Sequence, residues 1–230
     1  MKRDSKIITL INGSPRTVED STSHSLILLQ EKIFKMDGNK VFHVNARKSI
    51  TSGNRIQDFE TILKADVVVI TFPLYVYCLP GVLTRFLQEF YKYVKTQPDQ
   101  MVQKKIYAVV NCGFPEAGIN EDAVKVVQNF SQHIDADFRY GIMIGGGGMI
   151  GQTLNLPFMK RIRTQLNKDF LEVYDDIHGS NITAVENKSI EIKITRWLYY
   201  FMGERGWIFS AKKNGLKKKD LYRKPYQWID

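Results

Sequence analysis

The sequence predicts an α/β protein: a doubly wound parallel sheet of five strands, followed by a helical C-terminal extension. Short β-branched apolar runs alternate with stretches in which apolar residues recur at helical spacing, a pattern typical of strand–helix–strand units. The run at residues 66–72, DVVVITF, is apolar on both faces, as a central strand covered by helices on both sides should be. The chain has 230 residues, 43% hydrophobic and 25% charged, so it is long enough to bury a complete core.

Five runs are expected to form the strands. The first run, KIITLI, is β-branched and stops at Asn12-Gly13, whereas KVFHV alternates only weakly between apolar and polar residues. Because crossovers between parallel strands are right-handed, only a few topologies remain, and two doubly wound strand orders compete, one of them 2-1-3-4-5. In chain order the expected strands are residues 6–11, 40–44, 66–72, 105–110 and 138–144.

Helices are expected between these strands and after the last one. Leu83, Phe86, Leu87 and Phe90 recur at i, i+3, i+4 and i+7 spacing, which predicts a helix that faces the core. The expected helices are residues 23–36, 57–63, 80–94, 120–133, 156–173 and 190–203, with a loop at 175–187. We therefore expect an α/β domain at residues 1–150 and a helical, basic, aromatic-rich extension at residues 151–230.

Ligands of doubly wound sheets bind beyond the carboxyl ends of the strands, so the loops that follow the strands are the candidate site. The first of these loops contains neither G-x-G-x-x-G nor G-x-x-x-x-G-K-[ST], and it is not predicted to hold a pyrophosphate. It offers one guanidinium and several hydroxyls directly before a helix start, which suits a terminal phosphate. The competing interpretation is an ordinary helix cap. The candidate phosphate ligands are Ser14, Arg16, Ser21, Ser23 and Ser25.

Two later loops have the composition of a surface for a flat ligand. The loop at residues 73–81, PLYVYCLPG, is apolar where a solvated loop should be polar, which predicts contact with a flat apolar ligand or packing under a neighbouring subunit. The loop at residues 111–116, NCGFPE, contains Asn and Gly, which allow the backbone to approach the polar edge of a ring. The candidate residues are Pro73, Leu74, Tyr75, Val76, Asn111, Cys112, Gly113 and Phe114.

These three loops carry a resemblance to a known family. NGSPR after the first strand, F-P-L-Y-V-x-x-L-P-G after the third and NCGFPE after the fourth resemble the flavodoxin-like NAD(P)H-dependent FMN reductase and NAD(P)H:quinone oxidoreductase family. The resemblance covers roughly residues 5–150 and implies the flavodoxin-like strand order 2-1-3-4-5. It implies FMN as the cofactor, its phosphate held by the candidates of the first loop and its ring by those of the other two. His24 stands where the family pattern has an asparagine, which leaves open which hydroxyls at residues 21–25 bind the phosphate.

The resemblance implies an oxidoreductase that passes electrons from NADH or NADPH through bound FMN to a quinone, a nitro or azo compound, or free flavin. The flavin accepts the hydride at its N5 atom, so no catalytic side chain is expected. No metal site is expected, because the four histidines are scattered and there are only two cysteines. Two alternatives are an electron carrier without acceptor chemistry, and a flavin-fold protein that acts as a basic module for nucleic-acid or membrane surfaces.

Positive charge is concentrated near the end of the chain. The whole chain has 33 basic and 24 acidic residues, a net charge of +9, and residues 186–230 alone have 11 basic and 5 acidic residues, a net +6. The same segment is rich in large apolar residues, so we expect it to cover a homodimer interface or the site, with nucleic-acid or membrane binding as the weaker alternative. The chain shows no apolar run of membrane-spanning length and no secretory signal at its start, which favours the cytoplasm.

Overall fold

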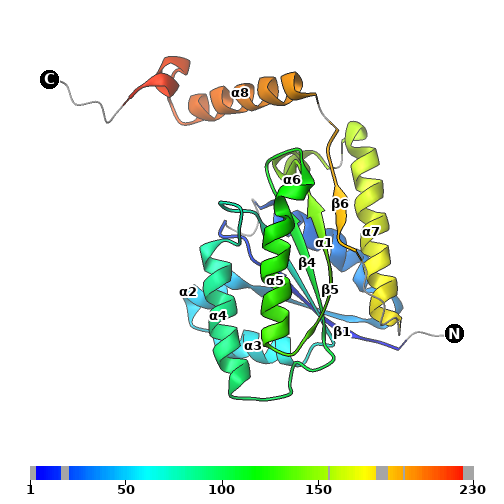
Figure 1. Cartoon of the computed structure of the whole chain (residues 1–230). Coiled ribbons are helices and arrows are strands. Elements are labelled where there is room, and N and C mark those ends of the chain that lie inside the picture. Colours follow the sequence, from blue (N-terminus) through cyan, green and yellow to red (C-terminus); the bar gives the residue numbers. More distant parts are fainter. Residues whose placement is uncertain (1–3, 17–20, 155, 180–185, 194, 225–230) are drawn as a thin grey trace. The chain divides into compact units, whose positions relative to one another are not determined.

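A six-stranded parallel sheet forms the centre of the protein (Figure 1). The computed structural model describes residues 4–16, 21–154, 156–179, 186–193 and 195–224. In chain order the strands are β1 (Ile7–Asn12), β2 (Lys40–Asn45), β3 (Val67–Pro73), β4 (Lys105–Asn111), β5 (Asp137–Ile144) and β6 (Lys188–Ile190). They lie in the order β2-β1-β3-β4-β5-β6, and each neighbouring pair is parallel.

The predicted doubly wound fold and the order 2-1-3-4-5 of the first five strands are confirmed, but the predicted number of strands is wrong. The sixth strand, β6, pairs with the end of β5, and its Ile190 is only 2% exposed. Three residues are too few to show the alternation of a strand. They also lie between the predicted loop at 175–187 and the predicted helix that starts at residue 190, so no local pattern identifies them.

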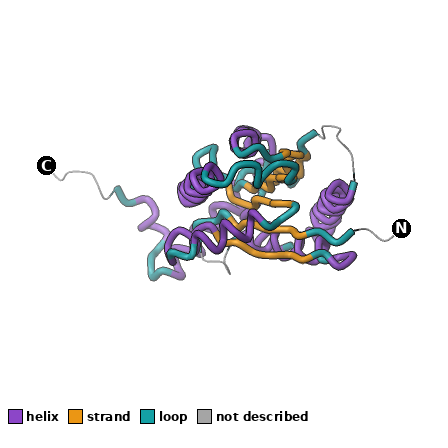
Figure 2. Tube along the Cα trace, turned by 90° about the horizontal axis from the view of Figure 1, so that it is seen from below, coloured by secondary structure: helices purple, strands orange, loops and turns teal. Residues whose placement is uncertain are grey.

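Helices cover both faces of the sheet, as the apolar central strand predicts (Figure 1, Figure 2). Successive residues of a strand point to opposite faces, so Val68 and Ile70 of β3 lie in one core and Val67 and Val69 in the other. One face carries α2 (Ala46–Ser52), α3 (Arg55–Leu63), α4 (Gly81–Lys95) and α5 (Glu121–His133), and the other carries α1 (Thr22–Phe34) and α7 (Lys160–His178).

Three helical stretches differ from the prediction. The sequence does not predict α2, whose start is capped by the Asn45 side chain and whose end is turned by Gly53 at a φ of 80°. The glycine run continues as the helix α6 (Gly147–Thr153), which follows Gly146 at a φ of 68°. The helix α7 continues through residues predicted to form a loop, because its last turn buries Ile177.

The chain divides into two compact units, Met1–Ile192 (unit 1) and Lys193–Asp230 (unit 2). Unit 1 extends past residue 150, where the sequence predicts a domain boundary; that position falls inside α6, and both α7 and β6 contact the rest of unit 1. Unit 2 contains α8 (Arg196–Lys213), which begins and ends later than the predicted helix, and a short 3-10 helix, η5 (Lys218–Tyr222). Among the described residues, no helix has both the length and the apolar composition that crossing a bilayer requires.

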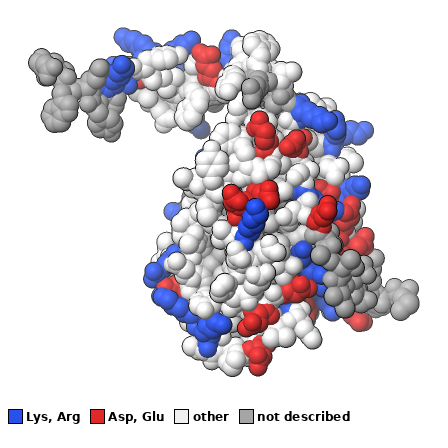
Figure 3. All heavy atoms as spheres, viewed as in Figure 1, with Lys and Arg blue, Asp and Glu red and all other residues white. Residues whose placement is uncertain are grey.

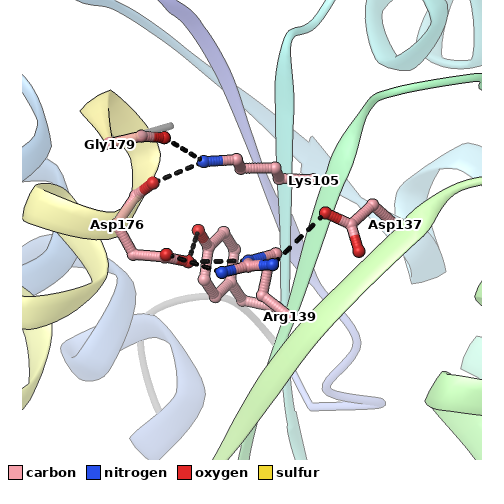
Figure 4. Close-up of polar contacts among 6 residues, drawn as sticks. Lys105, Asp137, Arg139, Asp176 and Gly179 are labelled. Carbon is pink, nitrogen blue, oxygen red and sulfur yellow. Dashed lines mark hydrogen bonds and ion pairs between the residues drawn. The ribbon is translucent and has the colours of Figure 1, made fainter. Parts of the chain in front are cut away.

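An ion-pair network fastens the end of α7 to the amino ends of β4 and β5 (Figure 4). The Arg139 guanidinium binds the Asp176 carboxylate twice, from Nη2 to Oδ1 at 2.8 Å and from Nε to Oδ2 at 2.9 Å, and the Tyr107 hydroxyl donates to Oδ2 at 2.6 Å. Lys105 Nζ donates to the Gly179 carbonyl at 3.0 Å. Burial alone would raise the pKa of Asp176, but hydrogen bonds from Arg139 and Tyr107 and the charges of Arg139 and Lys105 hold that pKa below its ordinary value.

Candidate functional site

A cavity of about 180 Å³ lies at the carboxyl ends of β1, β3 and β4, the edge at which a doubly wound sheet binds ligands. Three segments meet there: the turn after β1 with the start of α1, the loop after β3, and the loop after β4. The order β1-β3-β4 makes them neighbours in space although they are distant in sequence. The cavity is lined by Ser14, Arg16, Ser21, Thr22, Ser23, Pro73, Leu74, Tyr75, Asn111, Cys112, Gly113 and Gly148.

Hydroxyl groups and a guanidinium form one wall of the cavity. Ser14 is 1% exposed, and its Oγ accepts a hydrogen bond from the Arg16 amide at 3.2 Å, which stabilises the turn after β1. Ser21 caps α1, and its Oγ accepts from the His24 amide at 3.2 Å. The amides at the start of α1 and the Arg16 guanidinium make this wall suitable for an anion. Residues 17–20 of the same loop lie outside the described residues.

Asn111 connects the segments that form the cavity. Its Nδ2 donates to Ser23 Oγ at 3.2 Å and to the Phe72 carbonyl at 3.1 Å, so one side chain joins α1, β3 and β4. A Cβ atom at Gly147 would lie 2.7 Å from Asn111 Oδ1, so a larger residue at that position would displace this amide. The side chain is therefore buried structural support for the site as well as part of its lining.

The loop after β3 forms a two-residue hairpin turn that brings Tyr75 to the apolar side of the cavity. Tyr75 and Cys78 pair across the turn, with amide-to-carbonyl distances of 2.9 and 3.0 Å. Val76 and Tyr77 have positive φ values of 50° and 59°. Asn and Gly ordinarily occupy such turns, and a β-branched valine is strained there. Strained residues concentrate at functional sites, which fits a turn beside the cavity.

Most of the predicted site residues line the cavity, but three do not. Ser25 follows Ser23 by two residues in α1, so its side chain leaves the helix on a different face. Val76 is 93% exposed at the tip of the hairpin. The ring of Phe114 is exposed, although its carbonyl accepts from the Gly146 amide at 2.7 Å.

Two lining residues are absent from the predicted set of ligands. Thr22 belongs to the first turn of α1, and its Oγ1 donates to the Gly147 carbonyl at 2.9 Å, which connects α1 to α6. At Gly148 a Cβ atom would meet nothing within 4 Å, so this glycine borders open space. The hydroxyl-rich helix start and the glycine run are the sequence signals for these two positions, but neither signal selects a single residue.

Cys112 lines the cavity as a thiol with a raised pKa. Its Sγ lies 3.4 Å from the Phe114 carbonyl oxygen and 3.4 Å from Asn120 Nδ2. Burial raises the pKa of the thiol, and these two hydrogen bonds offset the increase only in part. A protonated thiol is a poor nucleophile, so the geometry favours a packing role. No three His, Cys, Asp or Glu side chains of the described segments come together as metal ligands.

The strand order and the position of the cavity beyond β1, β3 and β4 define a protein of the flavodoxin-like class. The chain belongs to the family described by a flavodoxin-like fold, whose model matches residues 6–135. No curated protein matches the chain in sequence.

Several solved structures share this fold. An NADH:FMN oxidoreductase in its apo form is 14% identical with a TM-score of 0.58, covering 78% of this chain and 94% of its own. General stress protein 14 from Treponema denticola, in complex with FMN, is 16% identical with a TM-score of 0.55; the match covers 75% of this chain and 99% of that protein. An NADPH-quinone reductase from P. pentosaceus is 14% identical with a TM-score of 0.53, covering 77% and 99%. At these identities the similarity establishes the fold alone.

Proposed function

We propose that the protein binds FMN non-covalently in this cavity and oxidises NADH or NADPH, passing the electrons to a small-molecule acceptor. The composition of the cavity carries the proposal: hydroxyls, a guanidinium and a helix start line one side, and an apolar loop lines the other. A ligand that suits both sides has an anionic end and a flat apolar body, and FMN has both. The fold shared with an FMN complex and with an NADH:FMN oxidoreductase supports this choice.

The hydroxyl wall would hold the phosphate. Ser14, Ser21 and Ser23 supply hydroxyls, Arg16 supplies a charged donor, and α1 directs its first amides and the positive end of its dipole toward the same region. None of the described residues that line the cavity is acidic, so a dianion would meet no like charge there. The donors present therefore fit a terminal phosphate.

The apolar side of the cavity would hold the ring. Pro73, Leu74 and Tyr75 would contact its face, and the segment from Asn111 to Gly113 would lie at its polar edge. Bound FMN supplies hydride chemistry at its N5 atom, so the chain needs no nucleophile of its own. Tyr75, which is 41% exposed, would limit the access of water, and Asn111 would keep the two loops in register.

The proposed acceptor is a quinone, a nitro or azo compound, or free flavin, and the proposed location is the cytoplasm, where both nicotinamide nucleotides occur. A second copy of the chain is the predicted alternative partner for the large apolar residues near the end of the chain.

Anaerobic reduction of the purified, FMN-loaded protein tests the proposal. We expect NADH or NADPH to bleach the flavin absorbance near ~450 nm, and a quinone added afterwards to restore it. Bleaching by dithionite but by neither nucleotide would assign the protein to the electron carriers instead. A protein that retains no flavin and binds none when FMN is added contradicts the proposal as a whole.

A further inference from the structure

Unit 2 exposes more large apolar side chains than a segment of its size should leave in water. Trp197, Trp207 and Phe209 are 72%, 71% and 72% exposed. Exposed apolar side chains in this number mark a segment that binds another molecule. The other exposed members of this set are Leu198, Tyr200, Phe201, Met202, Leu216, Leu221 and Tyr222.

Unit 2 also carries most of the net positive charge of the protein. Residues 193–230 contain 10 Lys and Arg against 3 Asp and Glu, a net charge of +7, whereas residues 1–192 contain 23 against 21, a net +2. Figure 3 shows more blue than red side chains on α8 and η5. A partner of this unit must therefore offer negative charge beside apolar material. The exposed lysines are Lys193, Lys212, Lys213, Lys217, Lys218, Lys219 and Lys224.

We propose that unit 2 binds the surface of a lipid bilayer that contains anionic lipids. At such a surface, negatively charged headgroups lie directly above acyl chains, so one surface satisfies both requirements of unit 2. Trp and Tyr side chains favour this boundary, and lysines reach the headgroups while their aliphatic stems stay in apolar surroundings. A single helix and a 3-10 turn of this composition lie on the bilayer and do not cross it.

Contacts within unit 2 group its apolar rings and offset the nearest negative charge. The rings of Trp197 and Phe201 are stacked with centroids 5.6 Å apart, and the Arg205 guanidinium lies 5.0 Å from the centroid of the Phe201 ring. Glu204 shares this side of α8, being seven residues from Trp197 and three from Phe201. Its carboxylate pairs with Lys218 Nζ of η5 at 3.4 Å, so this side of the helix keeps a net positive character.

The composition of unit 2 favours lipid over the other possible partners. Single-stranded nucleic acid is bound through cations and stacking aromatic rings, whereas unit 2 also exposes the aliphatic Leu198, Met202 and Leu216. Protein interfaces are depleted of lysine, but Lys212 and Lys213 lie within one helical turn of Phe209. Two copies of unit 2 packed face to face would also bring two charges of +7 together.

Co-sedimentation with vesicles tests the proposal on the whole protein. We expect binding to vesicles of mixed phosphatidylserine and phosphatidylcholine, much weaker binding to phosphatidylcholine alone, and a decrease as salt screens the charges. The measurement is made with and without FMN. The outcome therefore does not depend on the function proposed for the cavity.

Two variants in unit 2, each with a matched control in unit 1, locate the binding surface. Combined Lys217→Gln, Lys218→Gln and Lys219→Gln should weaken binding to mixed vesicles at least tenfold, since each cation near the surface contributes roughly fivefold. Combined Trp197→Ala and Trp207→Ala should also weaken it at least tenfold, and should do so at high salt as well. The control for the lysine variant combines Lys40→Gln, Lys64→Gln and Lys160→Gln, and the control for the tryptophan variant combines Ile56→Ala and Phe158→Ala; all five positions are exposed. Each control should change binding less than about twofold.

Three results overturn the proposal. The first is no binding to mixed vesicles, or equal losses in the unit 2 variants and the controls. The second is binding of a labelled single-stranded oligonucleotide, lost in the unit 2 variants, without vesicle binding. The third is sedimentation as a dimer that the tryptophan variant dissociates, again without vesicle binding. Circular dichroism checks that each variant is folded; the lysine variant changes only exposed positions, so it keeps the test decisive if the tryptophan variant misfolds.

Discussion

Polar residues at the cavity divide into those that support it and those that are available to a ligand. Asn111 and Ser14 are buried; the hydrogen bonds of Asn111 connect α1, β3 and β4, and that of Ser14 stabilises the turn after β1. Arg16 is exposed at the same cavity. Substitution of a supporting residue should therefore lower both stability and ligand affinity, whereas substitution of Arg16 should affect affinity alone.

Arg16→Ala should weaken FMN binding by about 1.5–3 kcal/mol, the contribution of a hydrogen bond to a charged group. The free energy of unfolding without FMN should change by less than about 0.5 kcal/mol, because the side chain is exposed. Fluorescence titration with FMN and urea unfolding measure the two quantities. The matched control is Arg85→Ala in α4, away from the cavity, and equal FMN affinity in both variants would refute the role of Arg16.

Ser23→Ala and Ser25→Ala form a matched pair within one helix. Only Ser23 lines the cavity and accepts the hydrogen bond from Asn111, so its loss should weaken FMN binding by about 0.5–1.5 kcal/mol. Ser25→Ala should leave the affinity unchanged. A larger effect at Ser25 than at Ser23 would show that the phosphate lies on another face of the start of α1.

Val76→Asn should raise the free energy of unfolding by about 1 kcal/mol, because asparagine tolerates a positive φ value that strains a β-branched residue. Val126→Asn is the control, since Val126 is 40% exposed in the regular helix α5, where asparagine brings no relief. Urea unfolding of both variants measures the difference. Equal changes in the two would mean that the hairpin is not strained.

At the scale of helices and strands, length and burial decide what can be predicted from the sequence. The strand β3 is predicted because seven successive residues are apolar or nearly so, and α4 because its apolar side chains keep one helical face. The strand β6 has three residues and owes its conformation to pairing with β5, which no local pattern records.

The candidate site, too, is predictable from the sequence only in part. Its loops are predictable because they follow strands of a doubly wound sheet. The hydrogen bond from Asn111 to Ser23 joins residues 88 positions apart. The hairpin has Val76 and Tyr77 where such a turn ordinarily has Asn or Gly. Both features depend on tertiary contacts, so the sequence pattern predicts that Asn111 and Val76 contact the ring but does not predict their structural roles.

Asp176→Asn should lower the free energy of unfolding by about 3–5 kcal/mol, because it leaves the buried Arg139 guanidinium without its counter-charge. Chemical denaturation measures the loss, and the exposed Asp122→Asn in α5 is a control expected to change stability by less than about 1 kcal/mol.

The same variant tests the pH dependence. In the folded protein, burial tends to raise the pKa of Asp176, but its hydrogen-bonded and charged partners lower that pKa by more. The ionised carboxylate therefore stabilises the fold above the unfolded pKa of about 3.9. This contribution is lost as the pH falls through the folded pKa. The stability difference between wild type and Asp176→Asn should therefore be constant near neutral pH and shrink below about pH 4. A difference that grows on acidification would contradict the assigned direction.

At the scale of the whole molecule, the chain separates a sheet-based unit with the candidate site from a basic C-terminal unit. The boundary follows β6, which belongs to unit 1 because Ile190 is buried and its carbonyl accepts from the Gly145 amide at 2.9 Å. Shortened chains that end just after or just before β6 test this position of the boundary.

Ending the chain after Ile192 should leave FMN affinity and the stability of unit 1 unchanged while abolishing binding to anionic vesicles. Ending it after Asn187 also removes β6, and the lost burial of Ile190 should lower the free energy of unfolding by about 2–5 kcal/mol. Thermal unfolding with FMN titration distinguishes the two proteins. Equal stability of the two would place the boundary before β6.

The ion-pair network of Asp176 lies at the amino ends of β4 and β5, whereas the cavity lies at the carboxyl ends of β1, β3 and β4. The two are separated by the length of β4, on the order of 20 Å. Natural selection for a different acceptor would act on residues 73–81 and 111–116, none of which belongs to that network. Chemical specificity can therefore diverge among descendants of such a chain while the attachment of α7 persists. A laboratory library confined to the exposed positions of these two loops, with the buried Asn111 and Cys112 kept, should accordingly lose few members to unfolding, and heat tolerance can be improved separately around Asp176.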